Sequence, residues 1–318
     1  MNFERAIQNF PKQFLWKPKI VNAGKLKRAS HYIVAGMGGS GLSANLISSW
    51  RPSFPLTIHN TYGLPQLPNT TLKKSLFIAS SYSGNTEEVT SALNKALKNK
   101  IPSAVVATGG KLISMAKKHS LPYILLPDTG IQPRSATGFS VIALLKLMGE
   151  KEGIKELEKL SSTLNVANAK KDGKKLAGEI RGKIPIVYSS FDNNAIAYNW
   201  KIRFNESGKI PAFSNVFPEL NHNEMMGFDY PRLSKLFHAI FLSDKNDHPR
   251  IIKRMKLTAS ILKKGGLPVT LMPLRGKSFW KKAFSSLMIA DWASYYTALK
   301  NGCDPGNEKT IETFKRLL

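Results

Sequence analysis

A loop rich in hydroxyl side chains, SSYSGNTEEV, spans residues 80–89 and has the residue types best suited to holding a phosphate. It follows an apolar run and precedes apolar residues at helical spacing, so the pattern predicts a strand, a tight loop and a helix. The free N–H groups and the dipole at the start of such a helix favour an anion. Because hydroxyls donate hydrogen bonds without adding charge, we expect Ser81, Ser83 and Thr86 to bind a phosphate monoester.

A second glycine-rich turn, GMGGSG, covers residues 36–41 and also follows an apolar run. It matches the GxGxxG pattern of dinucleotide-binding proteins, but that pattern alone is weak. It also requires an acidic residue about 20 residues later for the ribose, and the first acidic residue after these glycines is Glu87. We therefore favour a single phosphate, held by Gly38, Gly39 and Ser40, over a nicotinamide cofactor, and we expect no cofactor.

Strands that alternate with helices position these two loops. The strand candidates cover residues 32–37, 56–60, 76–79, 102–109, 122–127, 185–190, 237–243 and 268–274. Strands separated by helices of about a dozen residues predict parallel sheets with helical flanks, so the expected fold class is α/β.

The chain is long enough for two domains. Residues 150–183 are rich in Lys and Glu and fit an exposed helical connector. We expect an N-terminal arm over residues 1–30, a first domain with the phosphate loops over 31–155, and a second domain over 156–318.

The composition indicates a soluble globular protein: 42% of the residues are hydrophobic and 9% are aromatic. No apolar run is long enough to span a bilayer, and the N-terminus lacks the apolar core of a secretory signal. A single cysteine, Cys303, excludes an internal disulfide. We therefore expect a cytoplasmic protein with no membrane partner.

The net charge of +26 is unusual, and no acidic residue occurs between Glu4 and Glu87. The positive electrostatic field of so many lysines and arginines attracts anions, either small phosphates or nucleic acid. The lysines form no RGG run, zinc-finger spacing or RNP-like aromatic motif, so we do not expect a nucleic-acid partner. A Lys-rich solvated surface would explain the same charge.

Two later blocks narrow the interpretation: WKIRFNESGKIPAF at residues 200–213 and PELNHNEMMGF at residues 218–228. Together with GMGGSG and SYSGNTEE, they resemble the bifunctional phosphoglucose/phosphomannose isomerase family over about residues 32–318. The resemblance implies two SIS (sugar isomerase) domains, each a parallel sheet flanked by helices. It also implies a homodimer that interconverts glucose 6-phosphate, fructose 6-phosphate and mannose 6-phosphate without metal or cofactor.

Moving a carbonyl between C1 and C2 of a sugar needs a base that removes a proton from carbon and a group that stabilises the enediolate. The resemblance implies that Glu206 is the base and Arg134 the stabilising group. On its residues alone, without the resemblance, Glu206 would be interpreted as a solvated turn glutamate. Arg134 precedes an apolar helix, where the helix dipole disfavours a cation, and this favours a functional role.

The resemblance also implies that His222 opens the sugar ring and that the neighbouring subunit of the dimer donates it. Histidine suits this step because it exchanges protons near neutral pH. Lys315, in a helix expected over residues 307–318, would assist, although a lysine there is also common capping. Lys309 is the alternative. The stretch DPGNEK replaces the DPTP-like stretch of the family, and this bears on how freely the mannose epimer is admitted.

Two other functions are compatible with parts of the sequence. A sugar-phosphate sensor without catalysis would keep the hydroxyl loops but would need no combination of Glu206, Arg134 and His222. A nucleic-acid-binding scaffold would exploit the positive charge. No HxH, HExxH or CxxC spacing indicates a metal site, so we expect none.

Overall fold

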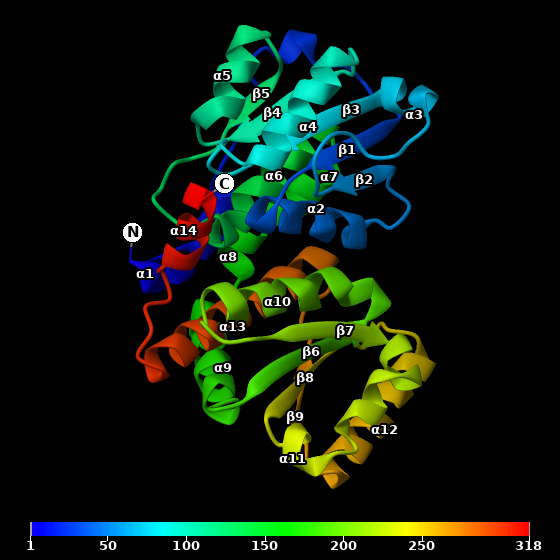
Figure 1. The fold of residues 1–318 in the computed structure, drawn as a ribbon, viewed down its shortest axis with the longest axis vertical. Helices are drawn as coiled ribbons and strands as arrows, with labels where there is room; N and C mark the ends of the chain where they lie inside the picture. The colour runs from blue at the N-terminus through cyan, green and yellow to red at the C-terminus, as the bar shows by residue number, and fades with distance from the viewer. Residues whose placement is uncertain (1, 318) are drawn as a thin grey trace. The chain divides into compact units, whose positions relative to one another are not determined.

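The structure is a computed structural model that describes residues 2–317. Its contacts divide the chain into two compact units. The first covers residues 9–163, and the second covers residues from 164 onward together with residues 2–8. Each unit contains one parallel sheet flanked by helices, so the predicted α/β class is confirmed (Figure 1). The boundaries expected after residues 30 and 155 stay predictions, and the second position lies inside helix α7 (Lys151–Glu158).

The first unit is built on a five-stranded sheet in the order β2-β1-β3-β4-β5. Its strands are β1 (His31–Ala35), β2 (Leu56–His59), β3 (Ser75–Ser80), β4 (Ser103–Ala107) and β5 (Tyr123–Leu125). All neighbouring pairs are parallel, and Ala35 lies opposite Ala79 at the carboxyl ends of β1 and β3. The loops that follow these two strands therefore lie at the same edge of the sheet.

Helices cover both faces of this sheet, which explains why its strands read as continuous apolar runs rather than as alternating patterns. Ile33, Phe77 and Val105 belong to one buried cluster with the apolar residues of α4 and α5. Figure 1 shows α2 and α6 on the other face. The helices of this unit are α2 (Gly38–Trp50), α3 (Asn69–Lys74), α4 (Glu87–Lys98), α5 (Gly110–Lys118), α6 (Thr137–Met148), α7 and α8 (Leu160–Thr163).

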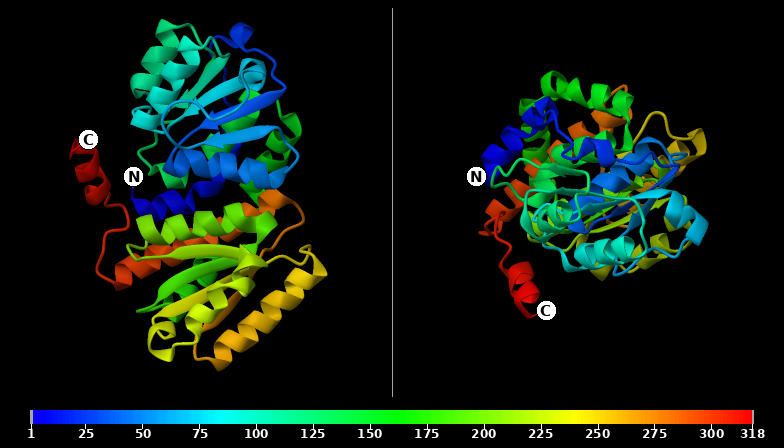
Figure 2. Two further views of the ribbon diagram at one scale, coloured as in Figure 1. Left: turned by 45° about the vertical axis from the view of Figure 1, so that its right-hand side comes forward. Right: turned by 90° about the horizontal axis from the view of Figure 1, so that it is seen from above.

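The second unit has a four-stranded parallel sheet in the order β7-β6-β8-β9. Its strands are β6 (Ile184–Ser190), β7 (Phe213–Phe217), β8 (Phe237–Ser243) and β9 (Val269–Pro273). Figure 2 shows α12 on one face of this sheet and α10 and α13 on the other. The helices of this unit are α1 (Phe3–Gln8), α9 (Val166–Glu179), α10 (Asn194–Glu206), α11 (Pro231–Ser234), α12 (Pro249–Lys264), α13 (Phe279–Lys300) and α14 (Lys309–Leu317).

Strand β7 corrects the expectation from the sequence, which placed no strand there. Its sequence, FSNVF, pairs only with β6 in the described sheet, and Phe213 at its start is exposed. A short edge strand with two small polar residues lacks the apolar run that identified the other strands. The interpretation of residues 150–183 as an exposed connector is also wrong in part, because α9 packs against α13 and buries Leu176 and Ala177.

A buried ion pair anchors α10 to α13. The Arg203 side chain donates from Nε to Asp291 Oδ1 at 2.7 Å, and both side chains are almost fully buried. Trp200 Nε1 donates to Ser286 Oγ at 2.8 Å along the same contact. Breaking a buried pair on one side typically costs about 3–5 kcal/mol, so these bonds fix α10 firmly. Across residues 2–317, no helix combines the length and apolar content required to cross a bilayer.

Candidate active site

The two loops predicted to bind phosphate meet at the carboxyl edge of the first sheet. The Tyr82 backbone N–H, in the loop after β3, donates to Ser40 Oγ in the first turn of α2 at 3.0 Å. A Cβ placed on Gly36 would lie 3.1 Å from the Ser80 carbonyl oxygen, so the two backbones are in close contact. Burial raises the pKa of Tyr82 beside this junction, so its phenol stays protonated.

The hydroxyls of these loops divide by exposure. Ser40 and Ser81 are buried. Ser81 Oγ lies 2.7 Å from Thr86 Oγ1 and accepts the Gly84 N–H at 3.1 Å, so it shapes the turn. Ser83 is exposed and Thr86 is half-buried. The structure therefore presents Ser83 and Thr86 to solvent on a loop that the two buried serines hold in shape.

Arg134 lies beside the glycine turn. A Cβ on Gly39 would lie 2.7 Å from the Pro133 carbonyl carbon and 2.8 Å from the Arg134 backbone nitrogen. Only glycine allows this approach, which places the short 3-10 turn Pro133–Ala136 directly against the start of α2. The Arg134 side chain is 1% exposed. Gly38, next to Gly39, is exposed and has a left-handed φ of +48°.

Glu206 is the last residue of α10, and its half-buried side chain lines a pocket of about 630 Å³ in the second unit. The end of α10 is fixed because Asn205 Nδ2 donates to the Ile210 carbonyl at 3.1 Å. The pocket is lined by residues of the α10–β7 turn, the loop after α13 and the start of α14: Asn205, Glu206, Lys209, Gly302, Cys303, Asp304, Asn307, Glu308, Lys309, Thr310 and Ile311. It therefore combines carboxylates with ammonium groups, as acid–base chemistry requires.

His222 is the last residue of a 3-10 turn, Glu219–His222, and is exposed. Its neighbours are anchored to their own unit. Asn221 Nδ2 donates to Thr258 Oγ1 at 2.9 Å, and Glu224 Oε1 accepts from the Tyr188 hydroxyl at 2.6 Å. Burial raises the pKa of Tyr188 far above its usual range, so this donor stays protonated. The anchored neighbours in the block PELNHNEMMGF thus hold the turn in place while the His222 side chain is exposed to solvent.

Glu206 and His222 lie at opposite ends of β7. Glu206 lies before the strand, where the Asn205 side chain donates to the carbonyls of Ile210 and Ala212, whereas His222 follows the last residue of the strand, Phe217. A strand of five residues is roughly 15 Å long. The second unit of one chain therefore presents these two side chains at separate edges.

The C-terminal lysines differ in position. Lys309, at the start of α14, lines the Glu206 pocket, whereas Lys315 lies further along this helix and is exposed. Lys315 stays a prediction, as does the helix face that included Leu318, which lies outside the described residues. Lys209 and Cys303 also line the pocket, and neither was among the predicted site residues. Lys209 is part of the NESGK block, and its place just after a predicted helix end is the signal that could have identified it.

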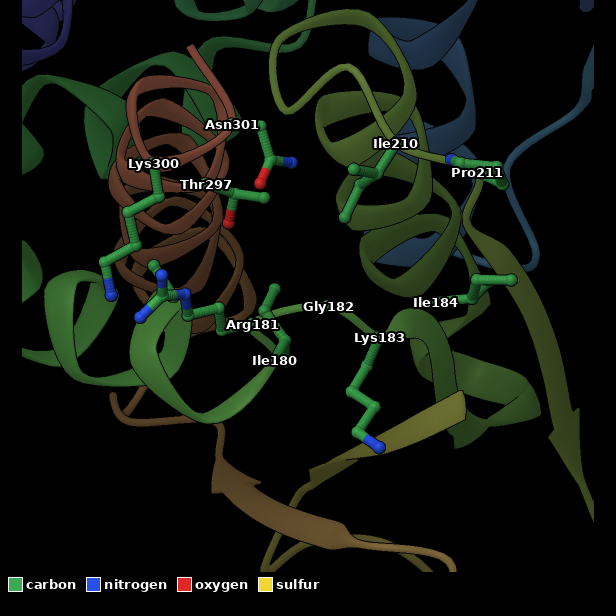
Figure 3. Close-up of a pocket in the computed structure, with 11 residues that line it drawn as sticks. Ile180, Arg181, Gly182, Lys183, Ile184, Ile210, Pro211, Thr297, Lys300 and Asn301 are labelled. Carbon is green, nitrogen blue, oxygen red and sulfur yellow. The ribbon is translucent and has the colours of Figure 1, made fainter. Parts of the chain in front are cut away.

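A smaller cavity of about 170 Å³ borders the same loops (Figure 3). Arg181, Lys183 and Lys300 line it, and none of its described lining residues is a carboxylate or a histidine. It therefore lacks a base for proton transfer from carbon. Among the residues that the structure describes, no group of three or more His, Cys, Asp or Glu side chains could hold a metal ion.

Comparisons with known proteins give consistent results. Residues 169–318 match the family model described as "Bacterial phospho-glucose isomerase C-terminal SIS domain". The chain is 33% identical to the bifunctional phosphoglucose/phosphomannose isomerase of Aquifex aeolicus, covering 99% of this chain and 97% of that protein. It is 34% identical to the protein of the same name from Thermoplasma volcanium, covering 92% of each.

A solved structure shares the fold at low identity. The putative phosphosugar isomerase from Clostridium difficile 630 aligns with a TM-score of 0.72 and 13% identity, covering 100% of this chain and 98% of that chain. At this identity the likeness concerns the fold alone. The near full-length matches at about one-third identity go further, and this chain belongs to the bifunctional phosphoglucose/phosphomannose isomerase family.

Proposed function

We propose that the protein is a metal-independent aldose–ketose isomerase that interconverts glucose 6-phosphate and mannose 6-phosphate with fructose 6-phosphate. Family membership supports this function, and the observation that carries it is Glu206, half-buried at a firmly anchored helix end in a pocket that Lys309 also lines. The alternative, a sugar-phosphate sensor, requires no such carboxylate. The name shared by these relatives, bifunctional phosphoglucose/phosphomannose isomerase, agrees with an enzyme.

The phosphate is held by the first unit. Gly38, Gly39 and Ser40 contribute the glycine turn, while Ser81, Ser83 and Thr86 contribute hydroxyls. The contact of Ser40 with the Tyr82 backbone supports this role, because it joins the two loops into one surface before a ligand arrives. A preorganised loop loses less freedom on binding than one that must fold around the phosphate.

The chemistry is a proton transfer between two carbons. After the ring opens, the Glu206 carboxylate removes the proton from C2 of the aldose, and the electron pair moves to form a cis-enediolate. The Arg134 guanidinium stabilises the negative oxygen. A proton passes from the C2 hydroxyl to O1, and Glu206 returns its proton to C1, which gives the C1 hydroxyl and C2 carbonyl of the ketose. Removal of the C2 proton from either epimer leads to the same intermediate, so one base serves glucose and mannose substrates.

Ring opening requires an acid–base group that reaches the ring oxygen and the C1 hydroxyl. We assign this step to His222 with the assistance of Lys315. The partner subunit of a homodimer supplies His222 in this proposal. The separation of Glu206 and His222 along β7 supports such donation, since a single second unit presents them at different edges. The outward position of His222 on its anchored turn supports it as well.

The experiment is a coupled assay of both aldose 6-phosphates with the wild type and Glu206→Gln. We expect the variant to lose roughly 10²–10⁴-fold in kcat, as is typical when a general base is removed. Glu158→Gln is the matched control, because Glu158 is also the last residue of a helix but is exposed. Full activity of Glu206→Gln would contradict the assignment of the base. A wild type that binds sugar phosphate without turnover would identify a sensor.

A further inference from the structure

The turn that follows α10 is tightly built. The Ser207 and Gly208 N–H groups both donate to the Arg203 carbonyl, at 2.8 and 3.0 Å. A Cβ on Gly208 would lie 2.7 Å from the Phe204 carbonyl oxygen, so a side chain would not fit there. The chain then passes through Lys209 in a left-handed conformation, with φ of +57°. This geometry turns the lysine side chain back toward the end of the helix that carries Glu206.

The Lys209 ammonium joins two segments of the pocket wall. Its Nζ donates to the Glu206 carbonyl at 2.7 Å, and it also donates to the Asn307 carbonyl. The last carbonyls of a helix lack partners within the helix, so a lysine donor satisfies one of them. Asn307 in turn accepts the Lys309 N–H on its side chain at 2.8 Å, where α14 begins. One cation therefore connects the backbone of Glu206 to the start of the C-terminal helix.

We propose that Lys209 is a positioning residue for the isomerisation: it holds the Glu206 carboxylate in place against the loop that starts α14. This inference rests on the proposed role of Glu206 as the carbon base. A hydrogen bond from a charged donor is stronger than one between neutral groups, and here it acts on both sides of the pocket. Proton transfer from carbon depends steeply on geometry, since a displacement of about 1 Å can reduce the rate roughly 10²-fold.

The first test compares steady-state kinetics of Lys209→Met, Lys209→Arg and a matched control. Lys100→Met is that control, because Lys100 also has a left-handed φ, of +55°, just after a helix, α4. We expect Lys209→Met to lower kcat by roughly 10–100-fold with KM changed little, because the phosphate is gripped elsewhere. Lys209→Arg keeps the cation and recovers part of kcat. Hydrogen exchange in residues 301–317 should rise in Lys209→Met.

The second test is a double-mutant cycle with Glu206→Gln. If Lys209 acts through Glu206, Lys209→Met adds no further loss in the Glu206→Gln background. Additive losses, a kcat within twofold of Lys100→Met, or a loss confined to KM would each overturn the positioning role. Circular dichroism shows whether Lys209→Met folds, and if it does not, Lys209→Arg takes its place in the cycle. A loss of kcat in Lys209→Arg that is additive with the loss in Glu206→Gln overturns the inference. A non-additive loss supports it.

The two proposals fail in different ways. A fully active Glu206→Gln variant would overturn the assignment of the base, and the positioning role of Lys209 with it. An inactive Glu206→Gln variant beside a fully active Lys209→Met variant would overturn the positioning role alone.

Discussion

At the scale of single residues, the second unit uses buried polar groups to fix its exposed ones. Arg203 is buried one helical turn before Glu206 and is bonded to Asp291, so the end of α10 has little freedom. His222 is exposed between anchored neighbours in the same manner. In both cases a side chain that could contact a ligand, Glu206 or His222, lies close in sequence to a side chain that makes structural hydrogen bonds, Arg203 or Asn221. Such support is what a precisely placed functional group requires.

His238 makes the stability of the second unit depend on pH. It is 4% exposed at the start of β8, with Nε2 2.8 Å from Thr270 Oγ1, and burial lowers its pKa below the usual 6.5. The unfolded chain thus takes up a proton at a higher pH than the folded chain does. The stability contributed by neutral His238 is complete above pH 6.5 and is lost as the pH falls from there toward the lowered pKa.

We therefore expect the wild type to lose more thermal stability between pH 7.5 and pH 5 than His238→Gln, in which the amide retains a partner for Thr270 but does not titrate. His119→Gln, a change at an exposed histidine, is the control and should behave as the wild type does. Melting temperatures by differential scanning calorimetry measure the difference. Equal losses in the wild type and His238→Gln would contradict the prediction.

The residues of the site were predictable to different degrees. Glu206 and the hydroxyls of residues 80–86 stand in recognisable blocks. The sequence shows Lys209 just after a predicted helix end, but its bridging role was not predictable, because its two backbone partners, the carbonyls of Glu206 and Asn307, are about a hundred residues apart and any residue type provides a carbonyl. Contacts between a side chain and a distant backbone leave no pattern in the sequence.

At the scale of elements, the geometry of the glycine turn at residues 36–41 depends on how closely α2 approaches the 3-10 turn that carries Arg134. Gly39→Ala places a methyl group 2.7–2.8 Å from backbone atoms of Pro133 and Arg134. Unlike a flexible side chain, these backbone atoms cannot relieve the clash by changing rotamer. We expect a loss of about 1–3 kcal/mol in stability. We also expect at least a tenfold fall in kcat/KM, since the glycine turn and Arg134 must separate.

Gly24→Ala is the matched control for that change, because a Cβ on Gly24 meets nothing within 4 Å. Chemical denaturation and the coupled assay give both quantities. Wild-type stability and activity in Gly39→Ala would show that the two segments are not held together as the structure indicates.

The elements themselves followed from the sequence where burial was strong. The central strands β1, β3, β4 and β8 are buried runs of apolar residues bounded by turn residues, and each lies within a residue or two of its expected position. Strand β7 was missed because an edge position needs no apolar run and pairing with β6 alone defines it. Propensity describes a residue's local preference, whereas an edge strand exists because of its neighbour.

At the scale of the whole molecule, the proposed donation of His222 predicts complementation between inactive variants. In a heterodimer of Glu206→Gln and His222→Ala, one site lacks both groups and the other has both. Random mixing gives heterodimers in half of the population, so we expect about a quarter of wild-type activity. Co-refolding the two variants, followed by the coupled assay, measures it.

Each variant refolded alone is the control and should stay inactive. If the mixture stays inactive as well, while size-exclusion chromatography with light scattering finds dimers, His222 acts within its own chain or not at all. A monomer in solution would exclude donation directly.

The pocket beside Glu206 contains a half-exposed thiol, and the chain has no second cysteine. A maleimide fluorophore or a nitroxide would therefore attach at one known place without any prior mutagenesis. Its spectrum would report on the surroundings of Cys303 as a sugar phosphate is titrated, independently of turnover. The sequence thus already contains a single site for thiol-specific labelling, which otherwise has to be introduced by mutagenesis.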